Sequence, residues 1–190
     1  MEKSDELLMT AYRQGNDDAF GELLSRHADS LLSFLIRMTG NREQAEDLFQ
    51  ETFMRVHDKA WSFNENRKFK TWLFTIASRI AIDERRKSVR RPITVTLNGI
   101  KELPSNPGRS TDPSRETAAQ ETKEQVQRAI NILPEQQRLV VLLSHYHGLT
   151  YTEIADTIKC SLSTVKTHMS RALRSLAKHL PDLKGEHACI

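Results

Sequence analysis

The chain has 190 residues, enough for one medium-sized domain or two small ones. Its 28 lysines and arginines against 25 aspartates and glutamates give a net charge of +3, too small to indicate a nucleic-acid partner unless the cations gather locally. The two cysteines, Cys160 and Cys189, lie far apart and form no CxxC pair, so the sequence indicates neither a disulfide framework nor a zinc site. No apolar run approaches the ~20 residues of a membrane span, and the charged N-terminus lacks a signal-peptide core. We therefore expect a cytoplasmic protein without membrane insertion.

Residues 5 to about 86 form helices separated by short polar turns, with few of the alternations typical of strands. The segment 45–60 is the most strongly patterned. Its apolar positions follow steps of three and four, which predicts one buried stripe made of Ala45, Leu48, Phe49, Thr52, Phe53 and Val56. The opposite face is acidic. An all-α fold is the expectation for this unit.

The next stretch, 61–91, combines a loop with a helix. The letters FNENRK at 63–68 predict the loop, and the helix that follows from about residue 71 ends in a run of cations. We expect Trp61 and Trp72 to pack in the core, because aromatic side chains at helix ends usually do so. The polar loop side chains are better candidates for contacts with a ligand.

Composition divides the chain after residue 91. Four of the six prolines fall in the segment 92–120 beside glycine, asparagine and serine, which predicts a flexible linker. The expected organisation is therefore a first domain at 5–91, the linker, a second helical domain at 121–180 and a loose tail at 181–190.

The second domain ends in a pair of helices joined by a tight turn. Thr150 and Glu153 fit a capping box and predict a helix start, KCS makes the turn, and a last helix runs from about Leu162 to Leu180. Leu162, Val165, Met169, Ala172 and Leu176 would face the core. The other side of this last helix carries hydroxyls and cations, which can bind phosphates and base edges. The pair of helices is therefore predicted to be a helix-turn-helix. An ordinary solvated surface helix is the alternative.

Two segments then resemble one family. LPEQQRLVVLLSHYHGLTYTEIADTIKCSLSTVKTHMSRALRSL is similar to the C-terminal domain of bacterial sigma factors of the extracytoplasmic-function (ECF) group. AEDLFQETFMRVHDKAWSF resembles that family's polymerase-docking segment, and FKTWLFTIASRIAIDERRK its promoter-reading helix. At Ser163, Thr167 and His168 the chain differs from the family pattern, and TVKTHMS also resembles the DNA-reading helix of LuxR-type regulators. A LuxR-type transcriptional regulator is therefore the second hypothesis, and an enzyme or RNA-binding module the third.

The resemblance implies a sigma initiation factor that binds core RNA polymerase through the β′ clamp and the β subunit, directs it to promoter DNA and assists duplex opening in a stress or envelope response. An anti-sigma factor is implied as a further partner. Polymerase would be met by Asp47, Gln50, Glu51 and Arg55. The minus-ten DNA would be met by Phe63, Asn64, Asn66, Arg67, Lys68, Lys70, Arg85 and Arg86. The minus-thirty-five DNA would be read by Thr164, Lys166, Thr167, Ser170, Arg171 and Arg174.

We expect no catalytic residues, no metal site and no cofactor. The chain lacks a phosphate-binding glycine loop, a nucleophile elbow and an HExxH motif. His145 and His147 are two residues apart, so on a helix they do not share a face. Cys160 has no second thiol at zinc-finger spacing.

Overall fold

The computed structural model describes residues 3–90 and 113–180, and all the regular elements in these two ranges are helices, so the predicted all-α class is confirmed. The first group comprises α1 (Asp5–Arg13), α2 (Asp17–Thr39), α3 (Arg42–Asp58), the short η1 (Ala60–Ser62) and α4 (Phe69–Arg90). The side chains of Ser4, Asn16 and Asn41 cap α1, α2 and α3 by accepting a backbone N–H. Gly40, with φ of 72°, ends α2 in the left-handed conformation that glycine adopts readily.

The second group comprises α5 (Pro113–Ile132), α6 (Glu135–Val141), η2 (Leu142–Tyr146), α7 (Tyr151–Ile158) and α8 (Leu162–His179). Helix α5 begins at Pro113, earlier than the predicted linker end at residue 120, because proline is well suited to a first helical turn. Residues 135–146 are divided between α6 and the π-helical turn η2. The remainder of the predicted linker, 92–112, and the predicted tail with Cys189 lie outside the described residues.

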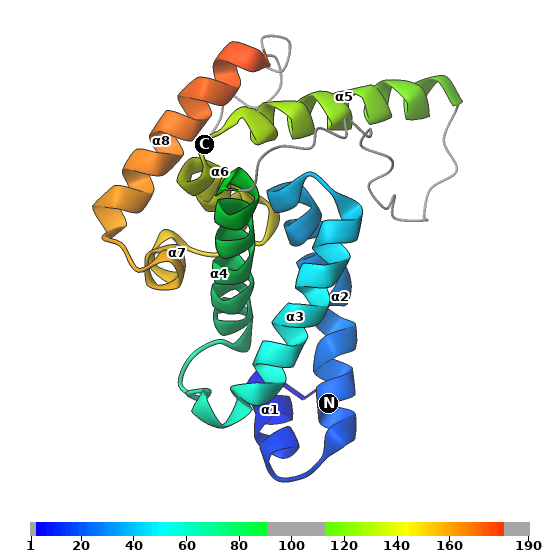
Figure 1. The fold of residues 1–190 in the computed structure, drawn as a ribbon, viewed down its shortest axis with the longest axis vertical. Helices are drawn as coiled ribbons and strands as arrows, with labels where there is room; N and C mark the ends of the chain where they lie inside the picture. Colours follow the sequence, from blue (N-terminus) through cyan, green and yellow to red (C-terminus); the bar gives the residue numbers. More distant parts are fainter. Residues whose placement is uncertain (1–2, 91–112, 181–190) are drawn as a thin grey trace.

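Helix α4 stands between the two groups and packs against α2 and α3 on one side and α7 on the other (Figure 1). Phe34 of α2 and Phe74 of α4 meet edge to face inside the first group, with ring centroids 5.2 Å apart. The predicted α3 stripe is confirmed: Phe49 is half-buried and the other five members are buried. The core therefore runs continuously from the first group into the second.

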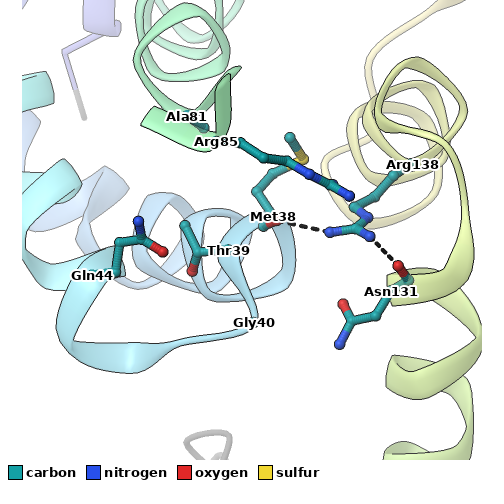
Figure 2. Close-up of a pocket in the computed structure, with 8 residues that line it drawn as sticks. All are labelled: Met38, Thr39, Gly40, Gln44, Ala81, Arg85, Asn131 and Arg138. Carbon is teal, nitrogen blue, oxygen red and sulfur yellow. Dashed lines mark hydrogen bonds between the residues drawn. The ribbon is translucent and has the colours of Figure 1, made fainter. Parts of the chain in front are cut away.

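Arg138 of α6 fastens the second group to the first. Its guanidinium is buried and donates hydrogen bonds to the carbonyl oxygen of Met38 at the end of α2, at 2.9 Å, and to that of Ile130 near the end of α5, at 3.1 Å. It also donates to the carbonyl oxygen of Asn131 (Figure 2). A cation at helix C-termini satisfies carbonyls that the helices leave unpaired. Burial, and then the charge of Arg85, lowers the pKa of Arg138 to about 10, so it stays charged at neutral pH.

His147 forms a second connection between the groups. The residue is only 5% exposed, and its ring packs against both Phe34 and Phe74, at centroid distances of 5.5 and 4.5 Å. Its Nδ1 is 3.2 Å from the Ser30 hydroxyl of α2. Next to it, Arg37 of α2 stacks over the Tyr146 ring at 4.1 Å. These contacts explain why His147 is buried although His145, two residues earlier, is exposed.

Two predicted core residues lie at the surface instead. Trp61 is 72% exposed, with the Arg13 guanidinium of α1 5.5 Å from its ring centre, so the expectation that it packs in the core is wrong. Trp72 is half-buried against Phe63 and Phe69, in agreement with the prediction. Leu162 is 42% exposed because it opens α8 at the turn, beyond the reach of the core.

Among the helices in the described ranges, none has the length and apolar character to cross a bilayer.

Candidate nucleic-acid interface

Helices α7 and α8 form the predicted helix-turn-helix. The capping box is confirmed: the Thr150 hydroxyl accepts from the Glu153 N–H at 3.3 Å, and the Glu153 carboxylate accepts from the Thr150 N–H at 2.8 Å. Lys159 ends α7 with φ of 54°, in the left-handed conformation that is uncommon outside glycine. Ser161 then caps α8 through the Thr164 N–H. The turn is therefore fixed at both ends by local sequence.

The outer side of α8 is called the recognition face here. It is defined by Thr164, Lys166, Thr167, His168, Ser170, Arg171 and Arg174, which are exposed or half-exposed. Val165, Met169 and Ala172 are buried on the other side, as predicted. Within the described part of the chain, no ion pair engages Lys166, Arg171 or Arg174. The structure thus keeps all six predicted minus-thirty-five residues on one accessible surface.

The 63–68 loop precedes α4 and is held by its own side chains. The Asn64 side-chain oxygen accepts the Asn66 N–H at 2.9 Å, and the Arg67 N–H donates to the Asn64 carbonyl at 2.9 Å. Asn64, Asn66, Arg67 and Lys68 are exposed. Phe63 is buried, with its ring 5.1 Å from that of Trp72. The predicted polar residues therefore share a surface, whereas Phe63 supports it from beneath.

Lys68 connects this loop to the helix-turn-helix. Its Nζ lies 2.9 Å from Oε1 of Glu153, the capping residue of α7, and this hydrogen bond raises the pKa of Lys68. Burial alone would raise the pKa of Glu153, but hydrogen bonds from Lys68 and Thr150 lower it to about 2. Glu153 is thus ionised across the ordinary pH range. It caps the start of α7 through the Thr150 N–H and also binds Lys68 of the 63–68 loop.

A cleft of about 280 Å³ lies between the two groups beside the same loop. It is rich in cations and hydroxyls, and the half-buried Trp72 forms part of its wall. Arg79 and Lys159 belong to it, although the sequence did not single them out as ligand contacts. Their shared position could not be recognised from spacing, because Arg79 is on α4 and Lys159 ends α7.

The other predicted minus-ten cations are separated from the loop. Lys70 is half-buried at the start of α4, and its charge contributes to lowering the pKa of His147. Arg85 and Arg86 are roughly 25 Å further along α4, from the rise of a helix. Arg85 lines the cavity of about 380 Å³ that also contains Arg138 (Figure 2), while Arg86 lines a groove with Glu51 and Arg55. The predicted residues therefore do not make one compact cluster.

Helix α3 presents the predicted acidic face. Asp47 and Gln50 are exposed, and the half-buried Glu51 accepts a 2.6 Å ion pair from Arg55 one turn later. Met54 extends the same face and is 67% exposed, an apolar residue that sequence reasoning missed. Its signal was available, since it follows Asp47 by seven residues and Gln50 by four, on the side opposite the buried stripe.

Nothing in the described ranges assembles three or more metal-ligating side chains. Burial raises the pKa of the Cys160 thiol, and a raised pKa reduces its reactivity.

Comparison with known proteins matches both groups of helices. The family Sigma-70 region 2 matches residues 23–91, and Sigma-70, region 4 matches residues 123–176. The ECF RNA polymerase sigma factor SigW of Bacillus subtilis (strain 168) is 32% identical over 177 residues, which cover 90% of this chain and 94% of SigW. SigX of the same organism is 30% identical over 172 residues, which cover 90% of this chain and 88% of SigX.

Solved structures also resemble this chain. The sigma factor RpoE of Bartonella quintana, in its complex with the anti-sigma factor NepR, matches with a TM-score of 0.69 and 28% identity over 86% of this chain and 97% of RpoE. CnrH, in complex with the cytosolic domain of CnrY, shares the fold with a TM-score of 0.70 and 23% identity over 94% of this chain and 98% of CnrH.

A region 2 helical group, a region 4 helix-turn-helix and their order in the chain define a sigma-70-type transcription initiation factor. The chain belongs to the ECF RNA polymerase sigma factor family. The sigma-factor prediction is thereby confirmed over the LuxR-type alternative, whose sensing unit would show alternating strands and helices where region 2 stands.

Proposed function

We propose that three surfaces of this sigma factor divide its work: the acidic α3 face docks on core RNA polymerase, the 63–68 loop takes the minus-ten strand, and the recognition face of α8 reads the minus-thirty-five element. The observation that carries the proposal is the segregation of charge. Exposed carboxylates gather on α3, and exposed cations that make no ion pair within the described residues gather on α8. We assign the domains as predicted, 5–91 and 121–180, with the segment between them as the connection.

The α3 face suits a protein partner better than DNA. Carboxylates repel phosphates, and charge complementarity orients docking between proteins. The exposed Met54 adds an apolar contact beside Asp47 and Gln50. This face is expected to meet the β′ clamp, with Arg55 and Glu51 held as a pair at its edge.

The 63–68 loop suits a single strand. Its exposed amides can hydrogen-bond base edges, and Arg67 and Lys68 can neutralise phosphates. Phe63 contributes by supporting the loop from the core. Arg85 and Arg86 lie far along α4 and would follow the strand rather than capture a base.

An anti-sigma factor is proposed as the regulatory partner. The support is the 28% identical RpoE of Bartonella quintana, whose structure was solved with the anti-sigma factor NepR. A cytoplasmic location, action as an initiation factor without catalysis of its own, and a role in a stress or envelope response complete the proposal.

Reconstitution with core RNA polymerase that contains no other sigma factor tests the proposed function. The chain is expected to produce discrete run-off transcripts from some genomic fragments, whereas core enzyme alone does not. A folded chain that binds core enzyme but gives no discrete transcript from any fragment would refute promoter recognition.

Reversing Asp47 and Glu51 to lysine is expected to weaken binding to core RNA polymerase at least about tenfold, because two like charges replace two complementary ones. The thermal unfolding midpoint should change little, since both side chains are at the surface. Fluorescence anisotropy of labelled chain with core enzyme measures the affinity. A matched control reverses exposed Asp29 on α2 and Glu124 on α5, which changes the net charge equally. Equal losses in both double variants would show that only total charge matters.

Replacing Arg171 with alanine is expected to reduce promoter binding by about 1–3 kcal/mol if its guanidinium contacts a base. The effect should then be concentrated at one base pair, because a phosphate contact would weaken all sequences alike. Competition binding of holoenzyme to promoters substituted one base pair at a time distinguishes the two. Lys178→Ala, an exposed cation in the last turn of the same helix, is the control.

A further inference from the structure

His168 lies at the edge of the recognition face, beside the buried stripe of α8. It follows Thr164 by four residues and precedes Arg171 by three, so the three side chains lie on the same side of α8. Its ring is half-exposed, between a buried turn below and solvent above. The position is therefore available to a ligand without any rearrangement of the helix.

The two ring nitrogens of His168 are in different environments. Nδ1 is covered by protein and has no hydrogen-bond partner, whereas Nε2 is accessible. A proton on Nδ1 would be a buried donor without an acceptor, which is costly. The neutral imidazole accordingly carries its proton on Nε2 and presents a hydrogen-bond donor at the surface.

The neighbouring hydroxyls are already engaged. The Thr164 hydroxyl is 2.8 Å from that of Ser161 in the N-cap, and the Thr167 hydroxyl donates to the Ser163 carbonyl at 2.9 Å. The Thr167 donor is thus used inside the helix, and the Thr164 hydroxyl shares a hydrogen bond with the N-cap. The imidazole N–H is thus a neutral donor that this edge of the face directs outward, beside Thr164 and the flexible cation Arg171.

From this arrangement we infer that His168 determines specificity at one base pair of the minus-thirty-five element, by donating from Nε2 to an acceptor on a base edge. The inference rests on the proposed function of α8. In the major groove guanine, adenine and thymine each offer an acceptor, but cytosine offers only its amino donor. His168 therefore discriminates against cytosine at the position it contacts.

A template library with a randomised upstream element tests this inference. Holoenzyme made with wild-type chain or with His168→Ala transcribes the library, and the transcripts are sequenced to give base preferences at every position. His168→Ala is expected to reduce discrimination against cytosine at one position by about five- to tenfold and to leave the other preferences intact. Circular dichroism confirms that the variant is folded.

Two further substitutions separate the ring nitrogens. Glutamine places an N–H donor close to the position of Nε2, and asparagine places one close to that of Nδ1. His168→Gln is expected to retain the discrimination and His168→Asn to lose it. His179→Ala, which removes an exposed histidine bonded to the Ser175 carbonyl in the last turn of α8, is the control and should change no preference.

Unchanged cytosine discrimination in His168→Ala, or a loss shared equally by all sequences, would overturn the inference while leaving the proposed function in place. A wild-type chain that selects no upstream sequence at all would overturn both together.

Discussion

The free energy of unfolding is expected to fall by about 2 kcal/mol between pH 7 and pH 5 because of one side chain, His147. Burial, followed by the charges of Lys70 and Arg37, lowers the pKa of His147 from 6.5 to about 3. Below pH 6.5 the unfolded chain therefore binds a proton that the folded chain refuses. The contribution of His147 to the free energy of unfolding is fully present above pH 6.5. As the pH falls below 6.5, it declines by about 1.4 kcal/mol per pH unit until the pH approaches the pKa of the folded state.

Urea denaturation at pH 7, 6 and 5 measures this dependence. His147→Gln and His147→Phe should each unfold more easily at pH 7, because they disturb the contacts with Phe34, Phe74 and Ser30. Their stability should nevertheless vary less with pH than that of the wild type, since the titrating group is gone. His179→Ala provides a control at an exposed histidine and should keep the wild-type slope. A wild-type slope in both His147 variants would contradict the assignment.

Replacing Arg138 with methionine is expected to lower the free energy of unfolding by about 3–4 kcal/mol. Methionine fills much of the volume but removes the Arg138 donors from the carbonyls of Met38 and Asn131, and leaves that of Ile130 with only the Leu133 N–H. Because Met38 lies in the last turn of α2 and Ile130 near the end of α5, the loss should loosen the contact between the two groups of helices. Chemical denaturation gives the energy, and small-angle scattering reports any expansion of the native chain.

Arg138→Lys is expected to recover part of the stability, because one ammonium can donate to some of the same carbonyls but lacks the planar fork of arginine. The matched control is Arg128→Met on α5, whose guanidinium is exposed and pairs with Glu124 within its own helix. That change should cost less than about 0.5 kcal/mol. Similar losses at positions 128 and 138 would show that the buried hydrogen bonds contribute little.

Local patterns of the sequence were enough for much of this fold. The α3 stripe follows helical spacing, and the capping box at Thr150 and Glu153 marks a helix start by chemistry that involves only neighbouring residues. The division of α8 into a buried and an exposed side follows from the same periodicity. Predictions failed where the position of a side chain depends on a distant element. Trp61 is exposed, and the contact given for its ring is with the guanidinium of Arg13, a residue 48 positions earlier.

Contacts between the two groups could not be predicted for the same reason. The hydrogen bond from Arg138 to Met38 spans 100 residues, and that between Ser30 and His147 spans 117. No periodicity within one helix encodes such a pairing. The site predictions were limited likewise: Phe63 belongs to the core because Phe69 and Trp72 close around it, and a fold was needed to see this.

The ion pair between Lys68 and Glu153 is short compared with the distance between the two promoter elements. It holds the 63–68 loop, proposed above to take the minus-ten strand, in direct contact with the helix-turn-helix, with 2.9 Å between the charged atoms. On a duplex, elements centred near minus ten and minus thirty-five are about 25 base pairs apart, or roughly 85 Å at 3.4 Å per step. The arrangement held by this ion pair cannot span that distance, so the proposed function predicts that α7 leaves α4 on promoter engagement and that Lys68 exchanges a carboxylate for a phosphate. In the folded protein the two proposed DNA-binding surfaces are therefore held close together, and their separation on the promoter would be set when this contact opens.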